Sequence, residues 1–174
     1  MIPQPHLSVQ VVNFAAEAPD GWQRLLDHAV AADRAGVDRV AVSDHVVFGD
    51  DLSDYAEPAK GGLAGGRQPT GPDGHWLEPL TTLAWLAGRT DRVRLQTGIL
   101  LAALRRPVVL AKSAATLDVL SGGRLDLGVG VAGRRSSTRP LAWSSPTAVA
   151  SWTMPSKSAR CCGAEPGCPT RARN

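Results

Sequence analysis

Short apolar runs alternate with helical patterns along the first 131 residues of the chain. Four runs have the length and composition of strands, and they cover residues 7–14, 37–43, 92–101 and 124–131. Three stretches between them repeat apolar residues every three or four positions, which predicts helices over residues 21–35, 79–89 and 107–120. Gly36 follows the first helix where a C-terminal cap belongs, and Pro107 opens the third, as proline often does in a first turn.

The order of these elements, β-α-β-α-β-α-β, predicts an α/β fold with a parallel sheet and right-handed crossovers. Their spacing fits either half of a (βα)8 barrel or a doubly wound sheet, and periodicity alone does not choose between the two. The Gly- and Pro-rich segment from about residue 47 to 75 is predicted to be a long loop, of the kind that closes over an active site as a lid.

The net charge of +3 is unevenly distributed along the chain. Residues 1–133 contain 12 Lys and Arg against 15 Asp and Glu, a net of −3, whereas residues 134–174 contain 7 against 1, a net of +6. The basic balance is therefore no reason to expect nucleic-acid binding by the folded part. No apolar run approaches the roughly 20 residues that cross a bilayer, and no signal peptide is visible at the N-terminus. We therefore expect a cytoplasmic protein without membrane or nucleic-acid partners.

Five stretches of the chain resemble the bacterial luciferase-like monooxygenase family, above all its coenzyme F420-dependent branch. They are Ala35–His45 (AGVDRVAVSDH), Leu77–Thr81, Arg92–Ile99, Arg106–Lys112 and Ala115–Gly130. Together they follow the family's order and spacing from about Leu7 to Val131, and the last stretch is the most specific. The resemblance implies the N-terminal half of a TIM-type (βα)8 barrel, with cofactor and a small-molecule substrate at the C-terminal ends of the strands.

The end of the second strand carries the candidate catalytic residue. Asp44 and His45 lie there, and the resemblance implies that both contribute to cofactor binding. In F420-dependent relatives a histidine at this place lies against the deazaflavin ring and acts as acid or base in hydride transfer. Imidazole suits that role because its pKa lies near neutrality. The alternative is a histidine that only caps the strand or bonds to the loop.

The ends of the third and fourth strands supply the other cofactor-binding candidates. Thr97, Gly98 and Ile99 match a region that in relatives carries a strained, sometimes non-prolyl cis bond behind the cofactor ring, although an ordinary turn is the alternative. Gly128 and Gly130 would leave room for the ring. As a dinucleotide motif this G-x-G is weak, because no third glycine with the Rossmann spacing supports it.

The resemblance implies hydride transfer between coenzyme F420 and a small organic substrate, with monooxygenation by reduced FMN as the alternative. His75 and Trp76 are candidates for substrate contact, but packing against the start of the second helix is the other interpretation. Glu78 at that start complements the helix dipole, which makes a catalytic role the weaker explanation.

The family pattern stops after Gly133, and residues 134–174 are rich in Ser, Pro and Arg with no apolar periodicity. We therefore divide the chain into a partial barrel, residues 1–133, and an irregular or disordered tail, residues 134–174. A frameshift explains the tail further, since codons read one base out of phase can encode the acidic loop and helix of the family. Two positions leave no synonymous choice: Trp152-Thr153 must give Asp, and Met154-Pro155 must give Ala. The three cysteines, Cys161, Cys162 and Cys168, lie in this tail without zinc-like spacing, so we expect no metal site.

A complete (βα)8 barrel needs roughly 200 residues or more, and this chain supplies at most four βα units. The first and fourth strands would then be edges with unpaired backbone groups, which invites self-association. We expect the chain as written to associate and to bind cofactor weakly. A catalytically inactive fragment of such an enzyme is one alternative function, and a separate α/β enzyme or binding module with a disordered basic tail is another.

Overall fold

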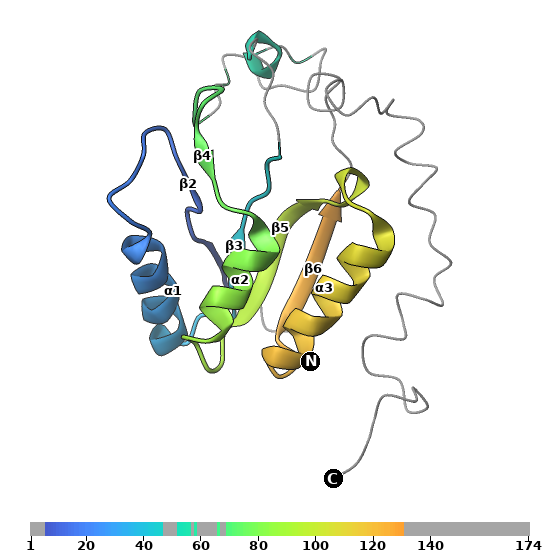
Figure 1. Cartoon of the computed structure of the whole chain (residues 1–174). Helices are drawn as coiled ribbons and strands as arrows, with labels where there is room; N and C mark the ends of the chain where they lie inside the picture. The colour runs from blue at the N-terminus through green and yellow to red at the C-terminus, as the bar shows by residue number, and fades with distance from the viewer. Residues whose placement is uncertain (1–5, 47–51, 57, 59–65, 67–68, 131–174) are drawn as a thin grey trace.

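The computed structural model describes residues 6–46, 52–56, 58, 66 and 69–130. In this part of the chain, three α-helices cover one face of a four-stranded parallel sheet (Figure 1). The strands are β1 (Ser8–Gln10), β3 (Arg39–Val42), β5 (Arg94–Leu101) and β6 (Leu125–Gly130), and the helices are α1 (Gln23–Ala35), α2 (Pro79–Ala87) and α3 (Pro107–Leu120). The described residues also include the short 3-10 helices η1 (Ser53–Ala56) and η3 (Ala102–Leu104) and the strand pair described below.

The order of the strands decides between the two folds that the sequence left open. The sheet order is β1-β3-β5-β6, with every neighbouring pair parallel, so each βα unit adds its strand beside the previous one. A doubly wound sheet instead reverses its strand order and has helices on both faces. Because the order never reverses and α1, α2 and α3 lie on the same side (Figure 1), the structure confirms the predicted half of a TIM-type barrel.

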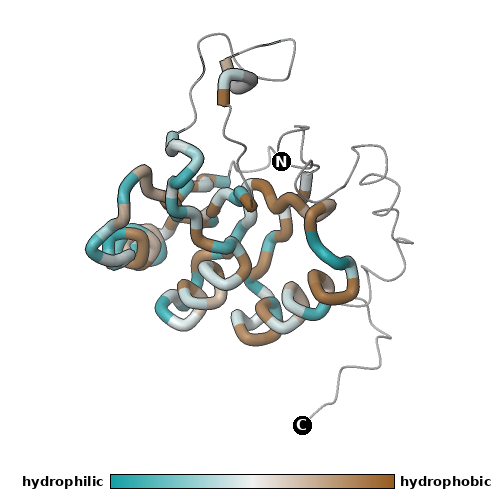
Figure 2. Tube along the Cα trace, turned by 45° about the horizontal axis from the view of Figure 1, so that its top comes forward, coloured by the Kyte–Doolittle hydropathy of each residue, from teal (hydrophilic) through white to brown (hydrophobic). Residues whose placement is uncertain are grey.

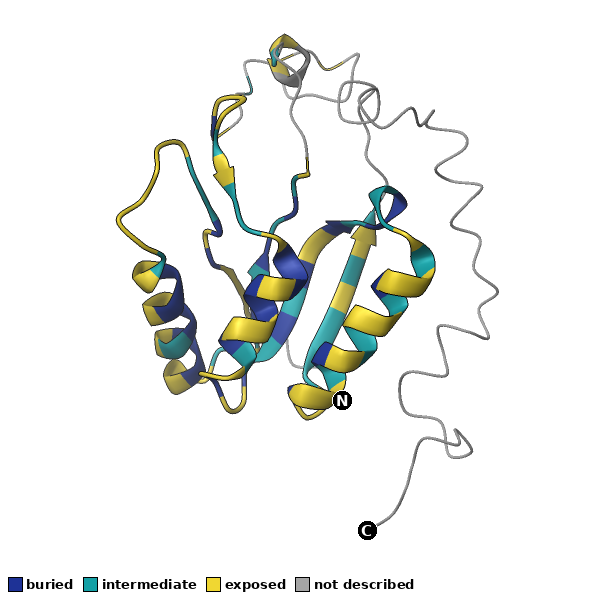
Figure 3. Cartoon of the chain, in the orientation of Figure 1, coloured by how far each residue is buried: buried dark blue, intermediate teal, exposed yellow. Residues whose placement is uncertain are grey.

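The hydrophobic core lies between the helices and the sheet. Apolar residues run along the strands and recur around the helices (Figure 2), and each helix turns its buried side toward the sheet (Figure 3). The fully buried strand residues alternate with partly exposed ones, as expected when only one sheet face packs against helices. The core consists mainly of Val40, Val42, Leu95 and Leu100 of the sheet and Leu25, Leu26, Ala29, Leu83, Leu86, Leu110 and Leu117 of the helices.

One predicted strand is wrong, because residues 7–14 do not form a single strand. Only Ser8–Gln10 pairs with β3, and a separate strand, β2 (Phe14–Ala15), pairs antiparallel with β4 (His75–Trp76). The chain therefore turns away from the sheet at Asn13, whose side chain is buried and hydrogen-bonded outside the ladder. Local periodicity did not predict this, because β4 has only two residues and begins at the last residue of the segment predicted to be loop.

The other elements lie close to their predicted positions. The third helix has the predicted bounds, and Gly36 caps α1 in a left-handed conformation with φ of 81°, as predicted. None of the helices among the described residues is long and apolar enough to span a membrane. The proposed tail, residues 134–174, and most of the predicted loop between residues 47 and 68 lie outside the described residues.

Candidate functional site

The segment after β3 contains Ser43, Asp44 and His45, and a buried asparagine holds it in place. Asn13 Nδ2 donates to the carbonyl oxygen of Ser43 at 2.8 Å, and the backbone N–H of Ser43 donates to Asn13 Oδ1 at 3.1 Å. The same Nδ2 donates to the carbonyl oxygen of Leu77 at 3.1 Å. Since Asn13 is fully buried, these bonds fix the ends of β1 and β3 and the segment before α2 against one another.

The carboxylate of Asp44 lies in a buried ion pair rather than on an open surface. Arg105 Nη1 donates to Asp44 Oδ2 at 2.5 Å and Arg105 Nη2 to Oδ1 at 3.1 Å. Oδ2 also accepts the backbone N–H of Leu101 at 2.7 Å. Only 1% of the Asp44 side chain is exposed, so both of its oxygens are occupied by the protein. The sequence predicts that Asp44 contributes to cofactor binding, and that contribution stays a prediction.

Arg105 extends this network to α2. Its Nη2 donates to Glu78 Oε1 at 3.0 Å, and Glu78 caps α2 by accepting the backbone N–H of Thr81 through Oε2 at 2.7 Å. Burial lowers the pKa of the Arg105 guanidinium, but the hydrogen bonds and charges of Asp44 and Glu78 outweigh it and hold that pKa above its ordinary value. The carboxylate of Glu78 is thus engaged at the start of the helix, as the sequence suggested.

His45 lies half-buried beside an aromatic pair. Its ring is 5.3 Å from that of Trp76 in an edge-to-face arrangement, and Trp76 stacks on Phe14 at 4.3 Å. Trp76 Nε1 donates to Thr70 Oγ1 at 2.9 Å, which fixes the indole. The short β2–β4 pair therefore builds one wall beside the candidate catalytic histidine.

The end of β5 is irregular at the predicted place. The register between β5 and β6 shifts between Thr97 and Leu100, and the Gly98–Ile99 peptide bond is cis, as the resemblance implies. Ile99 is 46% exposed, whereas Thr97 is fully buried and donates its hydroxyl to the carbonyl oxygen of Gly128 at 2.7 Å. Gly98 and Ile99 thus face outward, but the Thr97 side chain is turned into the sheet.

Gly128 and Gly130 have a structural requirement of their own. A side chain on Gly128 would collide with the carbonyl oxygen of Thr97, and one on Gly130 would collide with the side chain of Ile99. Both glycines therefore allow β6 to approach the irregular part of β5. The space that they leave is filled by β5 itself, and their contribution to a cofactor site stays a prediction.

Of the predicted residues, the structure brings Gly130 against Ile99, and it brings Asp44, which precedes His45, against Leu101 at the carboxyl end of β5. Gly98 lies over Ala41 of β3, because a Cβ on this glycine would be 3.5 Å from the Ala41 Cβ. We call Ala41, Gly98 and Ile99 the floor, since they carry no side chain or a small or aliphatic one at this part of β3 and β5.

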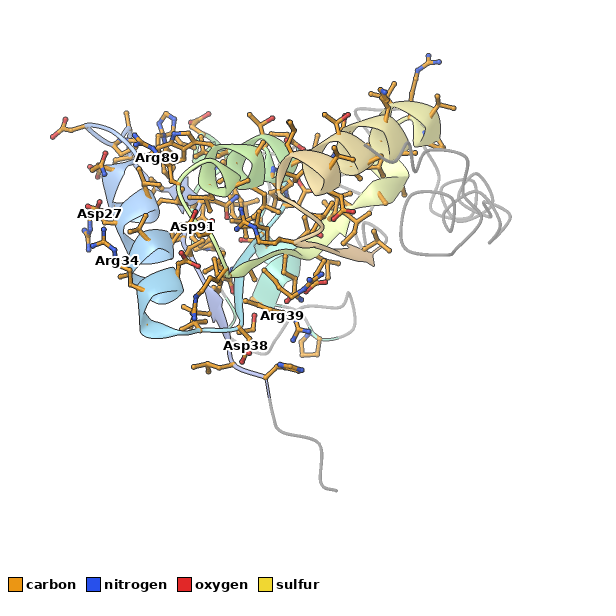
Figure 4. All side chains as sticks on the ribbon, turned by 90° about the horizontal axis from the view of Figure 1, so that it is seen from below. Asp27, Arg34, Asp38, Arg39, Arg89 and Asp91 are labelled. Carbon is orange, nitrogen blue, oxygen red and sulfur yellow. The ribbon has the colours of Figure 1, made fainter. Side chains whose placement is uncertain are left out.

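A charged cluster occupies the same sheet face, nearer to the amino ends of the strands. Asp126 accepts the Nε–H groups of Arg39 and Arg94, each at 2.8 Å, and Figure 4 shows Arg39 on the side of the sheet away from the helices. The hydrogen bond from Arg94 is the main reason why the pKa of Asp126 lies below its ordinary value. Within the described ranges, no group of three or more His, Cys, Asp or Glu could hold a metal ion, and the three cysteines lie outside those ranges.

Sequence analysis missed Asn13 and Arg105. Asn13 interrupts an apolar run, which is a signal that could have marked it. Arg105 follows the apolar stretch 99–104, but its partners Asp44 and Glu78 are 61 and 27 residues away along the chain. Nothing local in the sequence points to them.

Comparison with known proteins identifies the family. The model of the luciferase-like monooxygenase family matches residues 5–149, which extends past Gly133, where we expected the resemblance to end. An F420-dependent glucose-6-phosphate dehydrogenase of Kineococcus radiotolerans is 37% identical over 109 residues, or 62% of this chain and 26% of that protein. A putative coenzyme F420-dependent oxidoreductase of Mycobacterium tuberculosis is 51% identical over 53 residues, which cover 30% of this chain and 15% of the relative.

The solved structures agree with the fold. A monooxygenase from Streptomyces bottropensis has a TM-score of 0.61 and 25% identity, covering 90% of this chain and 42% of its own. An F420-dependent secondary alcohol dehydrogenase has a TM-score of 0.57 at 18% identity, covering 84% of this chain and 40% of its own. The chain thus spans less than half of these proteins. Because the family match covers well over half of the 174 residues, the chain belongs to the luciferase-like monooxygenase family.

Proposed function

We propose that this chain contributes the strand-end site of an oxidoreductase that transfers hydride between coenzyme F420 and a small organic substrate. The observation that carries the proposal is the floor of Ala41, Gly98 and Ile99, together with the binding of Asp44, which precedes His45, to the end of the same strand β5. The F420-dependent names of the sequence relatives support F420 over FMN. The aligned part spans about a quarter of the first relative, so the activity of a whole enzyme is proposed here and its substrate is not named.

The residues of this chain have separate tasks in the proposed reaction. When bound, F420 supplies the two-electron hydride chemistry. Gly98 and Ile99 support one face of the ring, because they present backbone and a single aliphatic side chain. His45 holds or donates the proton that must accompany hydride transfer at the substrate oxygen. The wall of Trp76 and Phe14 keeps water from one side of the imidazole. Asp44 fixes the end of β3 against β5 by accepting the backbone N–H of Leu101.

Binding of the two cofactors tests the proposal. The 174-residue chain is titrated with F420 and with FMN, and the quenching of cofactor fluorescence is followed for wild type and for His45→Gln. We expect F420 to bind the more tightly, and His45→Gln to lower any turnover by about 10²–10⁴-fold, the usual contribution of a general acid or base. Tighter binding of FMN favours the alternative, monooxygenation with reduced FMN, which the likeness to a 25% identical monooxygenase supports. Binding of neither favours a chain without independent activity.

We also propose that the 174-residue chain self-associates through the strands at the two margins of its sheet. Within the described residues, β1 and β6 each have one neighbouring strand. On β6, Leu127 and Val129 are 39% and 43% exposed. A second strand laid along β6 would contact these side chains and would pair backbone groups that have no strand partner within the described residues.

A further inference from the structure

The contacts of Arg105 connect the three segments that build the candidate site. Its guanidinium binds both oxygens of Asp44, one oxygen of Glu78 and the carbonyl oxygen of Leu101, the last through Nη1 at 3.2 Å. Asp44 precedes His45, Leu101 lies two residues after Ile99, and Glu78 caps α2. Only 17% of the Arg105 side chain is exposed; the Asp44 carboxylate that it binds is buried, whereas Glu78 is 45% exposed.

This network replaces the sheet ladder where the ladder ends. The pairing of β3 with β5 stops at Val42 and Thr97, immediately before the register shift. Beyond that point, Asp44 Oδ2 takes the backbone N–H of Leu101, a bond that a strand carbonyl would otherwise make. A carboxylate that is 1% exposed needs a charged partner to offset its lost hydration, and Arg105 provides one through two hydrogen bonds.

We propose that Arg105 is a positioning residue, which sets the place of His45 at the end of β3 by holding Asp44 against the end of β5. The hydrogen bonds of Arg105 go to Asp44, Glu78 and Leu101, so it acts on His45 through Asp44. The role rests on the proposed function, since positioning His45 matters for catalysis only if His45 serves a bound cofactor. The effect of Arg105 on the position of His45 does not depend on a bound cofactor.

The position of His45 is measured by NMR of the histidine ring signals in the full chain. The indole of Trp76 lies edge-on to His45 at 5.3 Å, so its ring current shifts the His45 signals and makes them sensitive to small displacements. His45→Gln assigns the signal, and His28 on the exposed side of α1 serves as an internal reference. The variants are Arg105→Met, Arg105→Lys and Asp44→Asn. The matched control is Arg106→Met, which removes the same charge from the exposed neighbouring residue.

We expect Arg105→Met and Asp44→Asn to move the His45 signal in the same direction, and Arg105→Lys to move it less. The double variant should equal the larger single effect, because both residues act through one contact. Arg106→Met should leave His45 in place, and His28 should not move in any variant. An unchanged His45 signal in a folded Arg105→Met variant overturns the proposal, and so does additive behaviour of the pair. If Arg105→Met does not fold, Arg105→Lys and Asp44→Asn decide by the same criterion.

Turnover with F420 gives the second measurement. Displacement of an acid-base group by about 1 Å lowers rates on the order of 10²-fold, so Arg105→Met should lower kcat by that amount with a smaller change in KM. Equal losses in Arg105→Met and Arg106→Met contradict the positioning role. A wild-type chain that binds no cofactor sinks the proposed function, whereas the NMR comparison still decides the role of Arg105.

Discussion

The hydroxyl of Thr97 donates to the carbonyl oxygen of Gly128 at 2.7 Å, and the backbone oxygen of Thr97 fills the space that a side chain on Gly128 would need. Two strands thus approach closely at the place where the register of β5 shifts. This contact fixes the residue before the outward-facing Gly98 and Ile99 against β6. Substitutions in β6 should therefore affect the candidate site.

Gly128→Ala should destabilise the protein because the added methyl group forces β6 away from β5. Overpacking of this kind costs about 1–3 kcal/mol, measured as the free energy of unfolding in urea. Gly71→Ala is the matched control, since a Cβ at Gly71 meets no atom within 4 Å, and surface changes of this kind stay within about 0.5 kcal/mol. Equal stability of the two variants would contradict the close approach.

Asp33→Asn should destabilise the junction between α1 and β5. The Asp33 carboxylate accepts the backbone N–H groups of Asp91, Arg92 and Val93, at 3.0, 3.0 and 2.6 Å. Burial raises the pKa of Asp33, but these bonds and the charge of Arg92 outweigh it and hold the pKa below its ordinary value. The asparagine side chain keeps one acceptor oxygen but places its NH2 group against backbone N–H donors. We therefore expect the free energy of unfolding to fall by about 1–3 kcal/mol at pH 7.

The same carboxylate should make stability depend on pH. Its folded-state pKa is depressed, so its contribution is fully present above the unfolded-state pKa of about 3.9 and is lost as the pH falls through the folded-state value. The difference in the free energy of unfolding between wild type and Asp33→Asn should therefore become smaller as the pH is lowered. Asp27→Asn, on the outer side of the same helix (Figure 4), makes the same chemical change away from the backbone N–H groups of residues 91–93 and is the control. A difference in unfolding free energy that stays constant from pH 7 to pH 3 would argue against the hydrogen bonds of the Asp33 carboxylate.

Val129→Lys should increase the monomer fraction of the 174-residue chain. The added charge lies at the apolar margin of β6 and opposes the pairing of another strand there. Sedimentation velocity at several concentrations measures the shift. Val108→Lys is the control on the outer surface of α3, where Val108 is 81% exposed. If both variants raise the monomer fraction equally, the chain does not associate through the sheet margin.

The coding DNA tests the interpretation of residues 134–174 directly. We expect that adding or removing one base near codon 133 restores a long open frame with an acidic loop and a helix. Because the family match extends to residue 149, the sequence must also show where along the gene the reading frame changes. Sequencing of genomic DNA through codons 125–180 decides the matter, since an unbroken alternative frame is either present or absent.

The sequence by itself determined the helices, most of the strands and the family. The third helix could be placed to the residue because its apolar spacing, its opening Pro107 and the glycines that follow it are all local signals. The parallel arrangement followed from the alternation of strands and helices, since such crossovers have one hand. His45 and the Gly98–Ile99 region were found through the resemblance to the family.

Only the tertiary structure decided how these parts meet. The choice of a half-barrel came from the strand order, which depends on contacts between whole units and leaves no local trace. The division of residues 7–14, the burial of Asn13 and the Arg105–Asp44 pair depend on partners between 30 and 64 residues away along the chain. Local periodicity reports which side of an element is apolar, but it does not report which distant polar group satisfies a buried one.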